Sequence, residues 1–111
     1  PIAIQGQIEG GVLMGLGYAL TEDFPLKDGV PQAKYGTLGL MRAPQIPDIH
    51  AIYVEKEKLL PFAYGAKGIG EIATIPTAPA AQGAYYSMDH VLRTSLPMKD
   101  TYYSKKQKAG K

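Results

Sequence analysis

The sequence predicts a single small α+β domain, with a glycine-rich N-terminal helix, a few β-strands, a short second helix and an extended C-terminal arm. Three observations support this prediction. Apolar residues recur at helical spacing near the N-terminus, a run rich in β-branched and aromatic residues spans residues 49–55, and an alanine-rich stretch follows Thr77. At 111 residues and 45% hydrophobic composition, the chain can bury a modest core, and we assign residues 1–111 to one domain.

The N-terminal helix is predicted by apolar residues four positions apart, which share one helix face. These residues are Ile8, Val12, Leu16 and Leu20. Glu9 lies in the first turn, where the helix dipole favours an acid, and Pro25 predicts the helix end. The preceding residues of "PIAIQGQIEGG" predict a short strand that leads directly into this helix.

Glycines interrupt this helix at an unusual density, and each costs about 1 kcal/mol relative to alanine. They are Gly10, Gly11, Gly15 and Gly17. One explanation is close approach of another backbone or of a ligand. The other is tight packing of the helix on a sheet.

Between the two helices the sequence predicts a turn, two strands and a rigid connection. Asp28, Gly29 and Pro31 mark the turn. Residues 33–41, "AKYGTLGLM", predict a strand weakened by glycine, and residues 49–55 predict the strongest strand, with charged residues at its end. The prolines of "RAPQIPDI", residues 42–49, predict an extended and rigid connection.

The second helix is predicted to begin at Thr77, which is a suitable N-cap residue, and Pro79 is tolerated in a first helical turn. Small residues then continue a short, closely packed helix. After it, "LRTSLPMKDTYYSKKQKAGK" predicts an extended arm that lies against a partner. Residues 104–111 are expected to form a flexible, solvated basic tail.

Composition argues against several classes of function. The chain has no cysteine, so it holds no disulfide, thiolate metal site or iron–sulfur cluster of its own, and we expect a reducing, cytoplasmic setting. The formal net charge is only +2, and much of the basic excess lies in residues 104–111, which argues against a nucleic-acid surface. His50 and His90 are too distant in sequence to predict a metal site.

Two features of the chain as a whole complete the prediction. No apolar run approaches the ~20 residues needed to span a bilayer, and no secretory signal opens the chain. The sequence begins with Pro1 and without a methionine, directly ahead of the predicted strand and helix. We therefore expect a piece of a longer polypeptide.

A glycine-rich loop, "YGAKGIGE" at residues 64–71, is the main candidate for chemistry. A phosphate-binding loop of the Walker type needs Ser or Thr after its lysine, but Lys67 is followed by Gly68. The glycine spacing also reverses the dinucleotide-binding pattern. An ordinary turn with a solvated acid is the simplest alternative.

Glu71 at the end of this loop has unusual neighbours. The residues after it, "IATIPTAPA", are almost wholly apolar or small and include no base. Partial desolvation there would raise the pKa of the Glu71 carboxyl and make it a better proton acceptor near neutral pH. Lys67 would oppose this shift if it reached the carboxylate.

Two motifs together resemble the C-terminal part of the molybdenum-binding subunit of the xanthine dehydrogenase and aldehyde oxidase family. They are "GQIEGGVLMGLGYAL" at residues 6–20 and "GAKGIGEIATIPTAPA" at residues 65–80. The connection "APQIPDI" and the closing "LPMKDT" also fit, so the resemblance covers nearly the whole chain. Among relatives, the chain looks most like bacterial xanthine dehydrogenase-type purine hydroxylases. It would then be a fragment of a larger molybdopterin-binding domain.

The resemblance implies a molybdenum hydroxylase, which inserts water-derived oxygen into a purine, a related heterocycle or an aldehyde. In this family a glutamate after a Gly-x-Gly run takes a proton from a metal-bound hydroxide, and the matching residue here is Glu71. The family glutamine that hydrogen-bonds the molybdenum cofactor matches Gln7, and Gly70 is a candidate for backbone contact beside the cofactor. No protein ligand to the metal is expected on this chain.

The same resemblance implies a molybdenum–pyranopterin cofactor shared with the rest of the subunit. Iron–sulfur clusters and FAD are expected on partner segments or subunits, and a homo-oligomer is compatible with the family. The isolated chain is expected to be inactive, since the substrate-facing segments are absent. Two alternatives stay open: a non-catalytic assembly or scaffold domain, and the same chemistry on an aldehyde, nicotinate or carbon monoxide.

Overall fold

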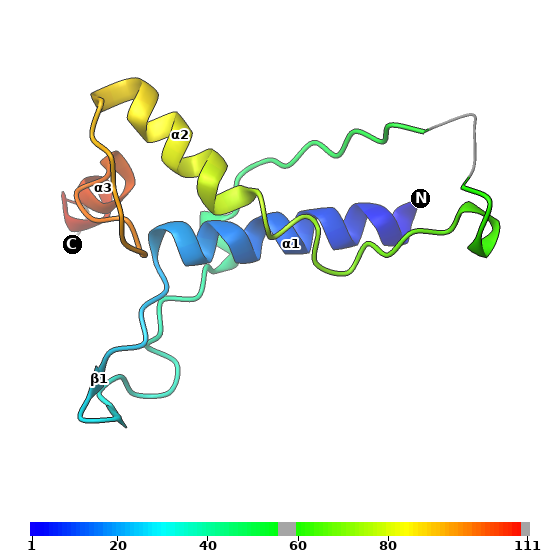
Figure 1. The fold of residues 1–111 in the computed structure, drawn as a ribbon. Helices are drawn as coiled ribbons and strands as arrows, with labels where there is room; N and C mark the ends of the chain where they lie inside the picture. The colour runs from blue at the N-terminus through cyan, green and yellow to red at the C-terminus, as the bar shows by residue number, and fades with distance from the viewer. Residues whose placement is uncertain (56–59, 110–111) are drawn as a thin grey trace.

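A computed structural model describes residues 1–55 and 60–109 of the chain, and it confirms the predicted α+β class. In this described part of the chain, three helices and one two-stranded sheet form the regular structure (Figure 1). The elements are α1 (Ile2–Leu20), β1 (Leu26–Lys27), β2 (Val30–Pro31), α2 (Thr77–Asp89) and α3 (Tyr102–Ala109), with short 3₁₀ turns at Ala43–Gln45 and Ala63–Gly65.

Helix α1 confirms the predicted N-terminal helix, but it differs at both ends. It begins at Ile2, so the predicted opening strand is wrong. These residues form helical hydrogen bonds from the first turn, beginning with the bond from Gln5 N to Pro1 O (2.9 Å). The helix ends at Leu20, before Pro25, because the amides of Thr21 and Glu22 both bond to Gly17 O and close the last turn.

The predicted turn at Asp28 and Gly29 is confirmed as the tip of a small hairpin. Strands β1 and β2 pair antiparallel, with Leu26 opposite Pro31 and Lys27 opposite Val30. Asp28 and Gly29 both have positive φ, 50° and 78°, as the tight hairpin turn of type I′ requires. Here glycine supplies a backbone conformation that other residues adopt only at a cost.

The two longer predicted strands are wrong within the described residues. Neither residues 33–41 nor residues 49–55 form a strand. A strand needs a ladder of hydrogen bonds to a neighbour. Among the described residues, one backbone bond, from Asp23 N to Leu38 O (3.0 Å), links residues 33–41 to another segment, and none links residues 49–55 to one. The predicted extended connection is also interrupted, because residues 43–45 form a 3₁₀ turn whose Gln45 side chain accepts a hydrogen bond from Arg42 N (2.8 Å).

Helix α2 packs against α1 and forms the main helix–helix contact of the chain. Its start differs from the prediction, because Pro76 occupies the N-cap position and Thr77 lies inside the helix. The Thr77 hydroxyl donates to Ala73 O (2.8 Å) instead of capping the helix. Pro79 lies in the first turn, as predicted.

The C-terminal arm folds back onto α1 and is extended only in part. Met98 N donates to Ala19 O (2.7 Å), and Met98, Thr101 and Ala19 are all buried. Beyond Thr101 the chain forms helix α3, where an extended arm and a flexible tail were predicted. The Ser104 amide donates to the Thr101 hydroxyl (3.1 Å), and this bond helps to start the helix. Residues 110–111 of the predicted tail lie outside the described residues.

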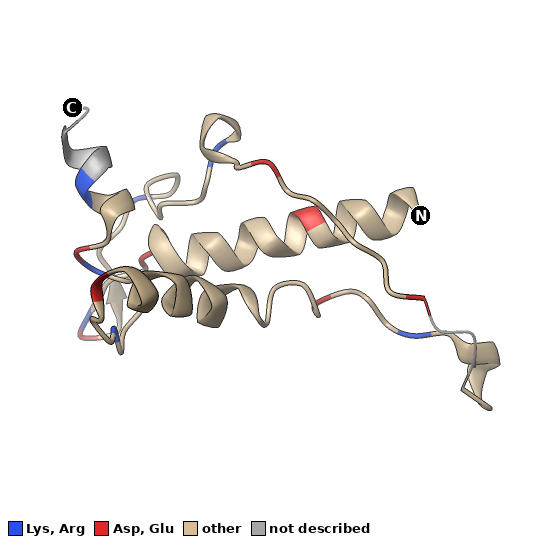
Figure 2. Ribbon diagram, turned by 90° about the horizontal axis from the view of Figure 1, so that it is seen from above, with Lys and Arg blue, Asp and Glu red and all other residues tan. Residues whose placement is uncertain are grey.

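Charged residues are unevenly distributed over these elements. Helix α1 carries one charged residue, Glu9, whereas Figure 2 shows most acidic and basic residues on the loops and toward α3. Although α1 is long and mostly apolar, no helix in the described part of the chain has both the length and the hydropathy to cross a membrane.

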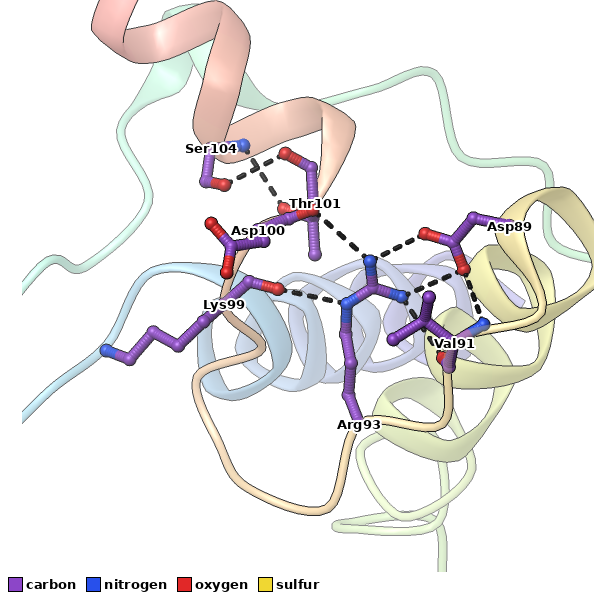
Figure 3. Close-up of polar contacts among 7 residues, drawn as sticks. All are labelled: Asp89, Val91, Arg93, Lys99, Asp100, Thr101 and Ser104. Carbon is purple, nitrogen blue, oxygen red and sulfur yellow. Dashed lines mark hydrogen bonds and ion pairs between the residues drawn. The ribbon is translucent and has the colours of Figure 1, made fainter.

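Arg93 ties the end of α2 to the C-terminal arm (Figure 3). Its guanidinium forms an ion pair with Asp89 (2.6 Å) and donates to the carbonyl oxygens of Lys99 (3.0 Å) and Asp100 (3.2 Å). It also lies over the Tyr85 ring, 5.4 Å from the centroid. Only 7% of the Arg93 side chain is exposed. The bidentate pair is therefore better shielded than an ordinary surface ion pair.

This cluster predicts a pH-dependent contribution to stability. The hydrogen bond from Arg93 lowers the pKa of the Asp89 carboxyl below its usual value of 3.8. A group whose pKa is lowered on folding stabilises the fold above its unfolded pKa, and this stabilisation is lost as the pH falls through the folded value. We expect Asp89→Asn to lower the free energy of unfolding at neutral pH, and this deficit to shrink on acidification. Urea unfolding of both proteins from pH 7 to about pH 2 measures this, and a pH-independent deficit would contradict it.

Candidate functional site

The predicted site forms where the N-terminal half of α1 meets residues 70–77. Gln7, Gly11 and Gly15 are four positions apart and therefore lie on one face of α1. The segment 70–77 runs along this face before it enters α2 (Figure 1). Gln7 Nε2 donates a long hydrogen bond to Gly70 O, at 3.5 Å, across 63 positions of sequence.

Two glycines of α1 make this approach possible. A Cβ atom added to Gly11 would lie 2.7 Å from Ala73 Cβ and 3.2 Å from Thr74 N. A Cβ atom added to Gly15 would lie 3.0 Å from Thr74 O and would also overlap Thr77. Of the two explanations left open by the sequence, close approach of another backbone therefore holds at these positions, and no sheet is involved.

The other glycines of α1 do not share this role. Nothing lies within 4 Å of a Cβ atom added to Gly6 or Gly10, and at Gly17 the overlap is with the flexible Glu22 side chain. From the sequence alone, Gly10 and Gly17 were grouped with Gly11 and Gly15. The signal that separates them is the four-residue spacing of Gln7, Gly11 and Gly15 along one face.

Glu71 directly follows the carbonyl group that Gln7 contacts. Its own carbonyl oxygen accepts a hydrogen bond from Thr74 N (3.0 Å), which turns the chain toward α2. The structure thus brings Gln7, Gly70 and Glu71 together, although Gln7 and Gly70 are 63 positions apart. The described residues do not provide the predicted desolvation of Glu71, because Glu71 is exposed and the isoleucines after it, Ile72 and Ile75, are themselves 58% and 72% exposed. Within the described residues Lys67 forms no ion pair with Glu71.

The loop before Glu71 has a strained start and an open end. Ala63, Tyr64 and Gly65 all have positive φ, at 51°, 52° and 78°. By contrast, Gly68 and Gly70 adopt no such conformation, and no atom lies within 4 Å of a Cβ atom added to either one. Their bare backbone leaves room for another group to approach beside Glu71.

The site offers hydrogen-bonding groups and one carboxylate. No group of three His, Cys, Asp or Glu residues with metal-binding geometry occurs in residues 1–55 and 60–109. Gln7 supplies an exposed carboxamide, which donates and accepts hydrogen bonds, and Glu71 supplies an acceptor. Such a set suits hydrogen bonding to a polar organic group.

A wide hollow in the described part of the chain lies elsewhere. It measures about 990 Å³ and is lined by the C-terminal end of α1, residues 35–42 and the start of α3. Neither Gln7 nor Glu71 lines it, so it carries no part of the predicted chemistry.

Comparison with known proteins confirms the resemblance inferred from the two motifs. The chain is 38% identical over 102 residues to a Bacillus subtilis protein that is named as one subunit of a probable xanthine dehydrogenase. It is 32% identical over 101 residues to the "Xanthine dehydrogenase molybdenum-binding subunit" of Escherichia coli O157:H7. Each alignment covers 88% of this chain. No protein-family model matches the sequence.

A third relative carries a different substrate in its name. The "Isoquinoline 1-oxidoreductase subunit beta" of Brevundimonas diminuta is 29% identical over 100 residues, which cover 89% of this chain. All three relatives are named as subunits, and all are much longer than this sequence. The chain spans 13%, 13% and 12% of their respective lengths.

Proposed function

Because this chain is related in sequence, over most of its length, to subunits of the xanthine dehydrogenase family, we propose that it is a segment of a molybdenum hydroxylase. In this proposal the segment supplies the general base, Glu71, and part of the cofactor wall, Gln7 and Gly70. The complete enzyme hydroxylates a purine or a related heterocycle with oxygen from water. We further propose that it works in the cytoplasm, in a complex whose other segments or subunits hold iron–sulfur clusters and FAD.

One observation carries this proposal: the hydrogen bond from Gln7 to the Gly70 carbonyl group. It joins the two motifs on which the family resemblance depends, and it brings the Gln7 amide to the backbone carbonyl group that directly precedes Glu71.

The exposed groups fit a molybdenum–pyranopterin cofactor. When bound, this cofactor supplies the two-electron oxidant and activates the water whose oxygen enters the product. Gln7 would hydrogen-bond the cofactor through its carboxamide and so orient it, while the open backbone at Gly68 and Gly70 would allow it to lie close to the loop. Glu71 would accept the proton released in the reaction, because a carboxylate in a closed, water-poor site is a competent base.

The exposure of Glu71 favours a second description of the isolated chain. The proposed reaction needs a base in a site from which water is excluded, whereas Glu71 of this chain is exposed to solvent. The 111 residues alone would therefore behave as a non-catalytic assembly domain. The substrate is a finer proposal, since aldehyde, nicotinate and carbon monoxide are compatible with the same chemistry. The isoquinoline in the name of one relative shows that substrates vary among similar subunits.

Replacement of Gln7 by alanine tests the cofactor-wall assignment. We expect Gln7→Ala in the complete subunit to lower molybdenum retention at least about tenfold, since residues that orient a metal centre commonly contribute 10- to 100-fold in affinity. Elemental analysis of molybdenum per subunit after dialysis measures this without any assay of turnover.

A matched control is Gln32→Ala, which removes an exposed glutamine near the hairpin, whose amide bonds only locally to Val30 O (2.9 Å). This variant should retain as much molybdenum as the unsubstituted protein. If the unsubstituted complete subunit binds no molybdenum at all, the proposed function fails. If it does bind molybdenum and Gln7→Ala retains it equally well, only the role of Gln7 fails.

A further inference from the structure

Residues 50–55 have a sequence that favours a β-strand, but they belong to no sheet among the described residues. The sequence "HAIYVE" is rich in residues that favour strands. Alternate side chains point to opposite sides of an extended chain, and here the sides differ in exposure. Ile52 and Val54 are 83% and 86% exposed, whereas Ala51 is half-buried and Tyr53 is 42% exposed.

The backbone of this segment is as open as its side chains. Among residues 1–55 and 60–109, no backbone hydrogen bond links residues 50–55 to any other segment. Figure 1 shows no strand beside this segment, which is drawn in green before the grey trace. Consecutive unpaired amides and carbonyls beside two exposed aliphatic side chains form a ready template for strand addition.

From this we infer that residues 50–55 are a strand of a sheet whose neighbouring strand belongs to the rest of the same molybdenum-binding subunit. The inference rests on the proposed function, because it requires that this chain be one segment of a longer subunit. The lengths of the relatives favour this occupant, since most of each relative lies outside the aligned region.

The side-chain pattern defines what the neighbour must provide. The exposed side presents Ile52 and Val54, so an apolar layer from the same subunit has to cover them. Ile49, just before the segment, helps to line a small groove with Gly6, Gly10 and Leu13 of α1. The start of the strand is therefore anchored on α1, and the free part projects toward its neighbour.

Hydrogen exchange of the backbone amides tests this inference. In the complete subunit, peptides that cover residues 51–55 are expected to exchange about 100-fold or more slowly than the same peptides in the 111-residue chain, since sheet amides open only with their element. The isolated chain should show fast exchange at every concentration. Equal, fast exchange in both proteins would overturn the inference. Protection of residues 51–55 that appears in the isolated chain as its concentration rises would mean that a second copy of the chain pairs with this segment, and this result would also overturn the inference.

Val54→Lys sharpens the test. In the complete subunit this position would be covered by an apolar layer, and a lysine placed there disfavours pairing at that edge. This variant should lose at least about tenfold of the protection at residues 51–55 in the complete subunit. The control is Tyr35→Lys, at a residue that is also exposed but lies outside the segment; it should leave this protection unchanged. The readout is independent of molybdenum. A complete subunit that protects residues 51–55 but binds no metal would refute the proposed function and keep the strand.

Discussion

Replacement of Glu71 by glutamine in the complete enzyme is expected to lower turnover about 10²–10⁴-fold, the usual contribution of a positioned general base. The amide keeps the size and most hydrogen-bonding capacity of the carboxylate, but it does not accept a proton near neutral pH. Glu71 is exposed and makes no ion pair among the described residues, so its replacement removes no internal support of the fold. Steady-state turnover, normalised to molybdenum content, measures the effect.

Asp28→Asn is the matched control, because it makes the same chemical change at another exposed position. Asp28 lies at the hairpin tip with φ of 50°, a conformation that asparagine tolerates equally well. Its turnover should stay within a factor of a few of the unsubstituted enzyme. If Glu71→Gln with normal molybdenum content also kept turnover within about tenfold, the base would have to be another residue.

The parts of the fold that the sequence predicted correctly depend on local signals. Apolar residues at helical spacing predicted α1, and Asp28 with Gly29 predicted the hairpin tip. Residues 50–55 show the opposite case. Their sequence favours a strand, but strand formation needs a hydrogen-bonding neighbour, and none pairs with them among residues 1–55 and 60–109. Tyr102–Ala109 was mispredicted for a different reason, because its basic composition was weighed instead of the local contact from Ser104 to Thr101 at the start of α3.

The candidate site, too, was predicted from the sequence only in part. Local sequence made Glu71 a candidate, and only the family resemblance connected it to Gln7 and to a metal. The structure adds the contact between Gln7 and Gly70 and the reason for it, which is the close approach at Gly11 and Gly15. The desolvation expected of Glu71 was inferred from its apolar neighbours. Of those neighbours, Ala73 and Thr74 lie against α1, whereas Ile72 and Ile75 stay exposed. Among the described residues nothing therefore closes over Glu71, and a closed environment has to come from other segments.

The close approach at Gly11 leads to a second large expected effect. In Gly11→Ala the new methyl group would lie 2.7 Å from Ala73 Cβ and 3.2 Å from the Ala73 and Thr74 backbone, so the segment that carries Glu71 has to shift. Overpacking of this kind costs about 1–3 kcal/mol, partly offset by the ~1 kcal/mol that alanine gains over glycine in a helix. We expect a net loss of about 0–2 kcal/mol in the free energy of unfolding. Turnover of the complete enzyme should fall by up to about 10²-fold, because displacement of a catalytic group by about 1 Å has effects of this size.

The adjacent residue supplies the control for this prediction. A Cβ atom added to Gly10 meets nothing within 4 Å, so Gly10→Ala in the 111-residue chain should gain up to about 1 kcal/mol of stability from helix propensity alone. Urea unfolding of the two variants compares an identical chemical change at neighbouring positions of one helix. Equal stabilisation of both would mean that Ala73 and Thr74 yield freely to the new methyl group. The glycine face of α1 would then not hold Glu71 in place, and its position would have to be set by segments outside this chain.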